Sequence, residues 1–92
     1  MELTELIADV ESRYFRTAQD TGANGNALFI WNRVREAAGL PELTRGDLWD
    51  RERNGYLAKI GEAVVKGDDS AVALYKSYVD YVDTARAKSE RR

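Results

Sequence analysis

The 92-residue chain contains neither cysteine nor histidine. Without cysteine there is no disulfide and no thiolate chemistry, and without histidine the usual general base and the commonest metal ligand are both missing. We therefore expect a non-enzymatic protein that holds no metal and no cofactor. No apolar run approaches the ~20 residues that span a bilayer. The acidic N-terminus also lacks the basic start of a signal peptide. These absences predict a cytoplasmic protein with no membrane partner.

Proline is nearly absent, and no run of β-branched residues alternates in the way a strand requires. Apolar residues recur instead at helical spacing in four segments. The sequence therefore predicts an all-α fold, a single small domain of four short helices. We expect a helical bundle whose last three helices are roughly antiparallel, because their connections are short. This domain should cover residues 1–87, and residues 88–92 should form a basic, flexible C-terminal tail.

The first two helices have recognisable limits. The first is expected over about residues 3–19, from the spacing of its apolar side chains. The second should begin at a cap on Asn24 or Asn26 and end near Ala38. Gly39 is expected in the left-handed conformation that closes a helix, with Pro41 preventing its continuation.

The last two helices have equally local signals. Residues 44–47, Thr-Arg-Gly-Asp, resemble a capping box with aspartate in place of glutamate, and they predict a helix to about Lys66. Gly67 should stop that helix. One of Asp68, Asp69 or Ser70 should cap the fourth helix, which is expected to reach about Ala87.

Residues 32–41, Asn-Arg-Val-Arg-Glu-Ala-Ala-Gly-Leu-Pro, with Arg-Glu-Arg at 51–53, resemble a helix–turn–helix segment of the SusD-type glycan-binding lipoproteins. The resemblance covers about a third of the chain and implies the geometry of the turn. Those proteins are several times larger and carry a lipidated cysteine, which is absent here. No function is carried over from them.

Two groups of charged residues are candidates for a site. Asp47, Asp50 and Glu52 are close in sequence, but carboxylates must converge in a pocket to hold Mg²⁺ or to transfer protons. On one helix these three point in different directions, so we interpret them as a solvated surface. Arg53 falls within an apolar stripe, where a buried arginine needs a carboxylate, an aromatic face or a ligand. We favour an internal ion pair. The open alternative is contact with an anion or a partner by three arginines: Arg33, Arg35 and Arg53.

Five residues are candidates for a protein interface. Phe15 and Phe29 lie off the apolar stripes of their helices, so they either fold under the nearby Gly/Asn loop or form an exposed patch. Val72, Tyr75 and Val79 widen the apolar surface of the last helix beyond one stripe. That excess predicts either a docking surface or a central helix that is buried on two sides.

The leading functional prediction is a small protein-binding module, an inhibitor or an accessory protein that acts through contacts on helix surfaces, with self-association left open. One alternative is a nucleic-acid-associated regulator using the helix–turn–helix-like segment 27–66, which the formal net charge of −2 disfavours. Another is a binder of a small anionic ligand. The sequence leaves open the partner, the oligomeric state and whether the source is a cell or a virus.

Overall fold

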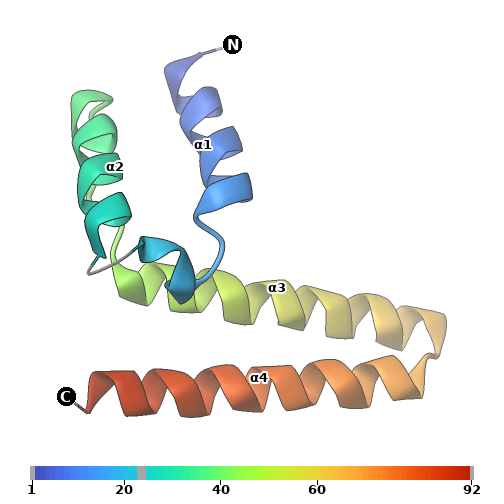
Figure 1. Ribbon diagram of the computed structural model, residues 1–92. Helices are drawn as coiled ribbons and strands as arrows, with labels where there is room; N and C mark the ends of the chain where they lie inside the picture. The colour runs from blue at the N-terminus through green and yellow to red at the C-terminus, as the bar shows by residue number, and fades with distance from the viewer. Residues whose placement is uncertain (1, 23–24, 92) are drawn as a thin grey trace. The chain divides into compact units, whose positions relative to one another are not determined.

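The computed structural model describes residues 2–22 and 25–91. These residues form five helical elements (Figure 1): α1 (Leu3–Tyr14), the short 3₁₀ helix η1 (Ala18–Thr21), α2 (Asn26–Ala37), α3 (Arg45–Lys66) and α4 (Asp69–Glu90). No strand occurs in the described ranges, and the predicted all-α class is confirmed. α3 and α4 have 22 residues each, so they are not short helices, although α3 ends at Lys66 as predicted. Of the helices in these ranges, none combines the length and apolar character that crossing a bilayer needs.

The chain divides into two compact units, Met1–Leu48 and Trp49–Arg92, where the sequence predicted one domain over 1–87. The boundary falls within the first turn of α3. In the first unit the buried apolar side chains are Ile7, Phe15, Ala18, Leu43 and Leu48. In the second they are Trp49, Ala63, Val79 and Val82. Gly46 lies two residues before Leu48, but it falls inside α3, so it did not indicate this division.

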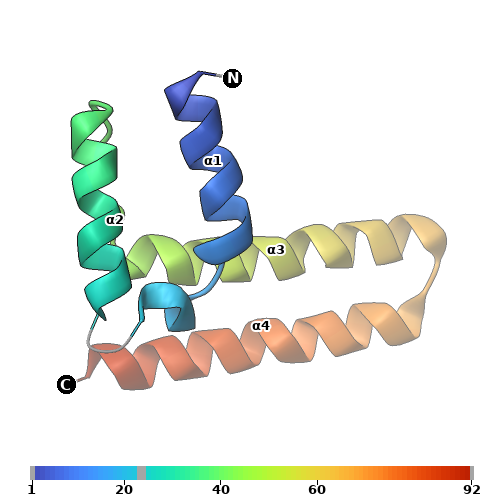
Figure 2. The ribbon, with the colours of Figure 1, turned by 45° about the horizontal axis from the view of Figure 1, so that its top comes forward.

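In the first unit, α1 and α2 run antiparallel and are linked through η1 (Figures 1 and 2). The prediction that the first helix reaches Gln19 is wrong, since α1 ends at Tyr14. Its end has a local cause. The Asp20 carboxylate accepts hydrogen bonds from the backbone N–H groups of Arg16 at 2.7 Å and Thr17 at 2.9 Å, which opens η1 instead. Side chains of this kind compete with the helical hydrogen-bond ladder.

The turn after α2 has the predicted geometry. Gly39 has a φ of 76°, and the Leu40 N–H donates to the Arg35 carbonyl at 2.9 Å. The Gly39 N–H donates to the Glu36 carbonyl at 3.0 Å, which completes a Schellman motif. At the other end the helix begins at Asn26, with Gly25 as its cap. Asn26 is thus inside the helix, and the alternative cap, Asn24, lies outside the described residues.

Replacing Gly39 with valine is expected to lower the free energy of unfolding by more than ~1 kcal/mol, because a β-branched residue tolerates the left-handed conformation poorly. A Cβ at Gly39 meets no atom within 4 Å, so the loss comes from the backbone alone. Urea unfolding monitored by circular dichroism measures it. Gly39→Asn is the matched control and should lose less, because asparagine tolerates this region. Equal stability of the valine variant and the parent would contradict the role of the turn.

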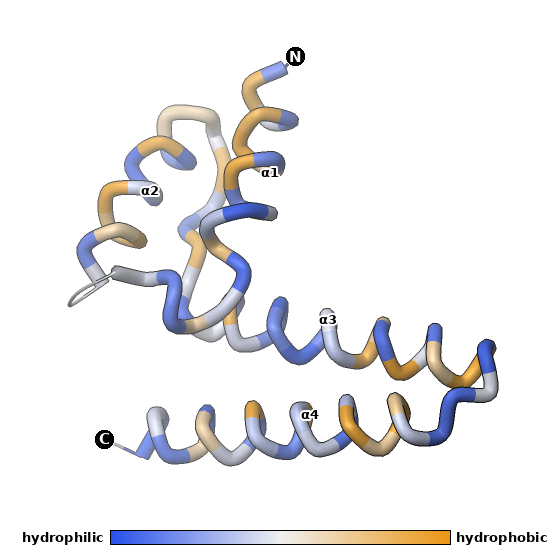
Figure 3. The backbone as a smooth tube through the Cα atoms, turned by 45° about the vertical axis from the view of Figure 1, so that its right-hand side comes forward, coloured by the Kyte–Doolittle hydropathy of each residue, from blue (hydrophilic) through white to orange (hydrophobic). Residues whose placement is uncertain are grey.

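In the second unit, α3 and α4 run antiparallel (Figures 1 and 2), and apolar residues recur along both helices (Figure 3). The predicted ends of both helices are confirmed where they depend on local chemistry. The Thr44 N–H donates to Asp47 Oδ2 at 2.8 Å, and the Asp47 N–H donates to Thr44 Oγ1 at 3.1 Å, a reciprocal capping box. Gly67 ends α3 with a φ of 71°. The Asp68 carboxylate then accepts the Ala71 N–H at 3.1 Å.

The last helix continues beyond its predicted end. α4 runs to Glu90, through residues 88–90 that were expected to belong to a flexible tail. Arg86 contributes to this extension, because its Nε donates to Glu90 Oε1 at 2.8 Å, one helical turn further on. Its Nη1 also donates to Asp50 Oδ1 on α3 at 2.6 Å. These two hydrogen bonds, first that to Glu90, raise the pKa of the Arg86 guanidinium above its ordinary value.

Candidate functional site

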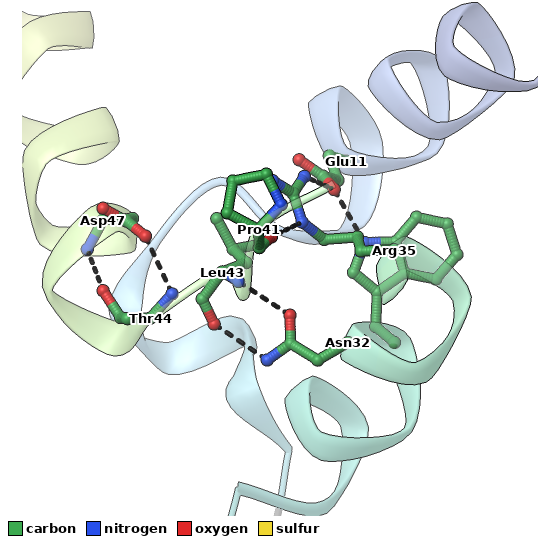
Figure 4. Close-up of polar contacts among 8 residues, drawn as sticks. Glu11, Asn32, Arg35, Pro41, Leu43, Thr44 and Asp47 are labelled. Atoms are coloured by element: carbon green, nitrogen blue, oxygen red, sulfur yellow. Dashed lines mark hydrogen bonds and ion pairs between the residues drawn. The ribbon is translucent and has the colours of Figure 1, made fainter. Parts of the chain in front are cut away.

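The inner side of α2 is organised around the buried carboxylate of Glu11 (Figure 4). Glu11 is only 4% exposed, on the last turn of α1. Its Oε2 accepts the Trp31 indole N–H at 2.8 Å and an Arg35 guanidinium N–H at 2.6 Å. The Phe15 ring stacks on Trp31 with the ring centroids 5.6 Å apart. A charged pair is thus enclosed by aromatic rings and joins α1 to α2.

This arrangement changes which side of α2 faces the core. Helical spacing predicts a stripe on α2 that includes Ile30, Trp31 and Val34, but Ile30 and Val34 are 64% and 39% exposed. Of these three, Trp31 alone is half-buried, and the other half-buried side chains of α2 are those of Leu28, Asn32 and Arg35. The reason is that Glu11 and Arg35 neutralise one another, so polar atoms are buried with their hydrogen bonds made.

Asn32 fastens the segment that follows α2. Its Oδ1 accepts the Leu43 N–H at 2.8 Å, and its Nδ2 donates to the Leu43 carbonyl at 2.9 Å (Figure 4). Arg35 adds a third contact, because its Nε donates to the Pro41 carbonyl at 2.9 Å. Residues 40–43 are therefore pinned along α2 rather than left as a loose loop. We call these residues the strap.

Replacing Asn32 with alanine is expected to lower the free energy of unfolding by about 1–3 kcal/mol for each backbone group left unsatisfied on Leu43. Leu43 is 2% exposed, so water does not readily replace the lost amide. Chemical denaturation measures the change. The control is Asn54→Ala at an exposed position of α3, which should shift stability by no more than about 0.5 kcal/mol. Equal losses at the two positions would contradict the pinning of the strap.

The outer side of α2 forms a groove with the strap. Its volume is about 310 Å³, and it is lined by Phe29, Asn32, Arg33, Glu36, Leu40 and Glu42. Phe29, which is 67% exposed, presents a large apolar side chain to a ligand at this concave surface. Leu40 is held in place by the Schellman turn. Phe29 and Leu40 are thus the apolar residues of a lining whose other members are polar or charged, and hydrogen bonds fix the position of Leu40.

The charged residues of the groove are available to a ligand. Within the described ranges, Arg33, Glu36 and Glu42 form no ion pair with another residue. Two carboxylates and one guanidinium thus border an apolar surface. In the same ranges, no three carboxylates are grouped so as to hold a metal ion.

The structure separates the predicted site residues. Phe29 and Arg33 lie together in the groove. Phe15 is 7% exposed and stacks in the core of the first unit. Arg35 is occupied by Glu11 and Pro41. Arg53 donates to Asp83 at 2.9 Å, which is the internal pair favoured from the sequence.

The predicted valine pair of the last helix is not exposed as the docking hypothesis required. Val79 is 8% exposed, while Val72 and Tyr75 are half-buried. The ring centroid of Tyr75 lies 6.3 Å from that of Tyr56 on α3 and 5.9 Å from that of Tyr78. These residues therefore belong to the side of α4 that packs on α3.

Within this tyrosine cluster, the pKa of Tyr56 is raised from 10.0, first by burial, then by the charge of Glu52 and by Tyr78 and Tyr75. The neutral phenol is thus favoured in the folded state. Its contribution to stability is present below pH 10 and is lost as the pH rises through the raised pKa.

Sequence reasoning missed Glu11, Asn32 and the strap. One signal was present, because Glu11 follows the buried Ile7 by four residues and so lies on the same face of the helix. No comparable local signal pointed to Asn32, whose partner is eleven residues away.

No protein family, curated protein or solved structure matches the chain.

Proposed function

We propose that this protein is a small non-enzymatic protein-binding module, an inhibitor or accessory protein, whose binding surface is the groove between α2 and the strap. The observation that carries the proposal is the exposed Phe29 beside a groove of about 310 Å³. Aromatic side chains in such positions supply much of the energy of protein interfaces, often 2 kcal/mol or more for one residue. The carboxylates of Glu36 and Glu42 favour a partner segment with an apolar side chain next to a cationic one.

The rigidity of the groove supports this use. Asn32 and Arg35 hold the strap through hydrogen bonds of 2.8–2.9 Å. A surface that is already ordered loses little conformational entropy when a partner binds, so more of the contact energy appears as affinity. The half-buried Leu40 then lines the groove together with Phe29 as a fixed apolar contact.

The two alternatives receive less support. Both relied on arginines, yet Arg35 pairs with Glu11 at 2.6 Å and Arg53 with Asp83 at 2.9 Å. Arg33 is then the remaining candidate of the three, beside Glu36 and Glu42 in the groove. A nucleic-acid surface or an anion site needs an excess of positive charge, which this groove does not have.

Affinity capture from cells that produce the protein natively, with quantitative mass spectrometry, tests the proposal. The bait is compared with Phe29→Asp and with the control Val65→Asp, which alters a side chain that is 88% exposed in the second unit. A loss of 2 kcal/mol corresponds to roughly 30-fold weaker binding. We expect a protein whose recovery falls by about this factor with Phe29→Asp and is unchanged with Val65→Asp. Equal recovery with all three baits would contradict the proposal.

A further inference from the structure

α4 carries two apolar runs on different sides. The first run packs on α3 and is buried or half-buried: Val72, Tyr75, Val79, Val82 and Arg86. The second run begins one residue earlier in the sequence. Its members are separated by the same alternating intervals of three and four residues: Ala71, Leu74, Tyr78, Tyr81 and Ala85. Of this second run, Leu74 is 47% exposed and Tyr81 66%. Tyr78 is 40% exposed and lies at the border between the two runs, because its ring centroid is also 5.3 Å from that of Tyr56 on α3. This spacing is typical of the face by which one helix of a coiled coil contacts another helix.

The surroundings of this exposed run are nearly free of charge. At about 100° per residue, it lies in a sector of α4 roughly 160° wide. Of the charged residues of α4, which is described throughout, Lys88 alone falls in that sector. The neighbouring positions hold small residues: Ser70, Ala73, Ser77 and Thr84. The Ser77 hydroxyl donates to the Leu74 carbonyl at 2.6 Å, so covering it leaves no donor unpaired.

From this pattern we infer that a second copy of the chain packs its α4 antiparallel on this face, forming a homodimer. When two 22-residue α4 helices overlap over their full length, Leu74 faces Ala85 of the second copy. Tyr78 then faces Tyr81 of the second copy. Because the dimer has two-fold symmetry, the Leu74–Ala85 contact and the Tyr78–Tyr81 contact each occur twice. We call this run the α4 seam.

The seam suits its own copy for two physical reasons. The first reason is packing, because the bulky Leu74 of one copy contacts the small Ala85 of the other. The two α4 helices can therefore approach closely at both ends. The Tyr78 and Tyr81 side chains of the two copies fill the centre of the interface. Charge gives the second reason. The flanking residues Ser70, Ser77 and Thr84 are uncharged, so a copy brings no like charges into contact. This surface is separate from the groove on α2, and the inference stands independently of the proposed function.

Sedimentation equilibrium over a range of protein concentrations tests the dimer. The wild-type chain should show a mass twice its own 10.4 kDa. Tyr81→Lys should raise the dissociation constant at least 30-fold, whereas Val65→Lys, at an exposed position of α3, should leave it unchanged. Circular dichroism shows that each variant remains helical. If Tyr81→Lys lowers the helix content, Leu74→Lys replaces it. A monomer at every concentration, or a dimer that both seam variants leave intact, overturns the inference.

Disulfide trapping tests the antiparallel register, because the natural chain contains no cysteine. A mixture of Leu74→Cys and Ala85→Cys chains should form a mixed disulfide on oxidation, while Leu74→Cys alone should not. A parallel pair would give the opposite result and overturn the register. If the chain stays monomeric but Tyr81→Lys abolishes the capture of a different protein, the seam belongs to that protein and the homodimer is overturned.

Discussion

Replacing Glu11 with alanine is expected to lower the free energy of unfolding by about 3–5 kcal/mol, because the Arg35 charge would remain in a largely enclosed site without its partner. The side chain of Arg35 is 12% exposed, so water can only partly solvate the guanidinium. The Trp31 indole N–H loses its acceptor in the same variant. At roughly 4 °C per kcal/mol, the melting temperature should fall by at least about 12 °C. Thermal and urea unfolding measure both values.

Two controls separate the loss of the ion pair from a general effect on α1. Glu5→Ala removes an exposed carboxylate from the same helix and should change stability by no more than about 0.5 kcal/mol. The double variant Glu11→Leu with Arg35→Leu removes both charges, and it should be far less destabilised than the sum of its single variants. Additive losses would contradict a coupled pair at the centre of the first unit.

Replacing Leu48 with alanine is expected to lower the free energy of unfolding by about 2–5 kcal/mol. Leu48 is fully buried at 0% exposure, so the variant loses the burial of its methyl groups and leaves a cavity. Leu57→Ala is the matched control, because Leu57 lies on the same helix and is 41% exposed. Its loss should be clearly smaller. Equal losses would contradict the placement of Leu48 in the core, and denaturant midpoints decide between the two results.

The sequence predicted the helix ends that depend on neighbouring residues. Gly39 and Gly67 both have positive φ, the Thr44–Asp47 box forms with both its bonds, and Asp68 caps α4. Each of these features is formed by residues that lie close together in the sequence, so it can be predicted from that short segment alone. The early end of α1 was missed because Asp20 acts on backbone groups that lie within an otherwise regular apolar pattern.

The inner face of α2 could not be read from its own periodicity. Arg35 is drawn inward by Glu11, which lies 24 residues earlier in the chain. A helix that buries a charged side chain against a distant partner exposes apolar residues that would otherwise form its core, here Ile30 and Val34. An ion pair between residues far apart in the sequence thus decides which face of α2 is buried, in place of the hydrophobic stripe. The residues near Arg35 in the sequence do not indicate that pair.

The candidate site was predicted in part. Phe29 and Arg33 were both identified from the sequence, Phe29 because it lies off the stripe of its helix, and both line the groove. The other wall depends on the strap, whose position follows from the Asn32 amide bonds to Leu43. A concave surface arises only when these two segments are placed side by side. The α4 seam was overlooked because its residues share one broad apolar stripe with those that pack on α3.

Whether the groove on α2 binds a protein can be measured by site-specific photo-crosslinking. A benzophenone amino acid is introduced at Phe29, where the natural side chain is aromatic and exposed enough to leave room for the larger group, and separately at the exposed Val65 as the control. After irradiation in cells that produce the protein natively, we expect one defined adduct with another protein from position 29 and none of that mass from position 65. The same adducts from both positions, or no adduct from position 29, would contradict a binding groove on α2.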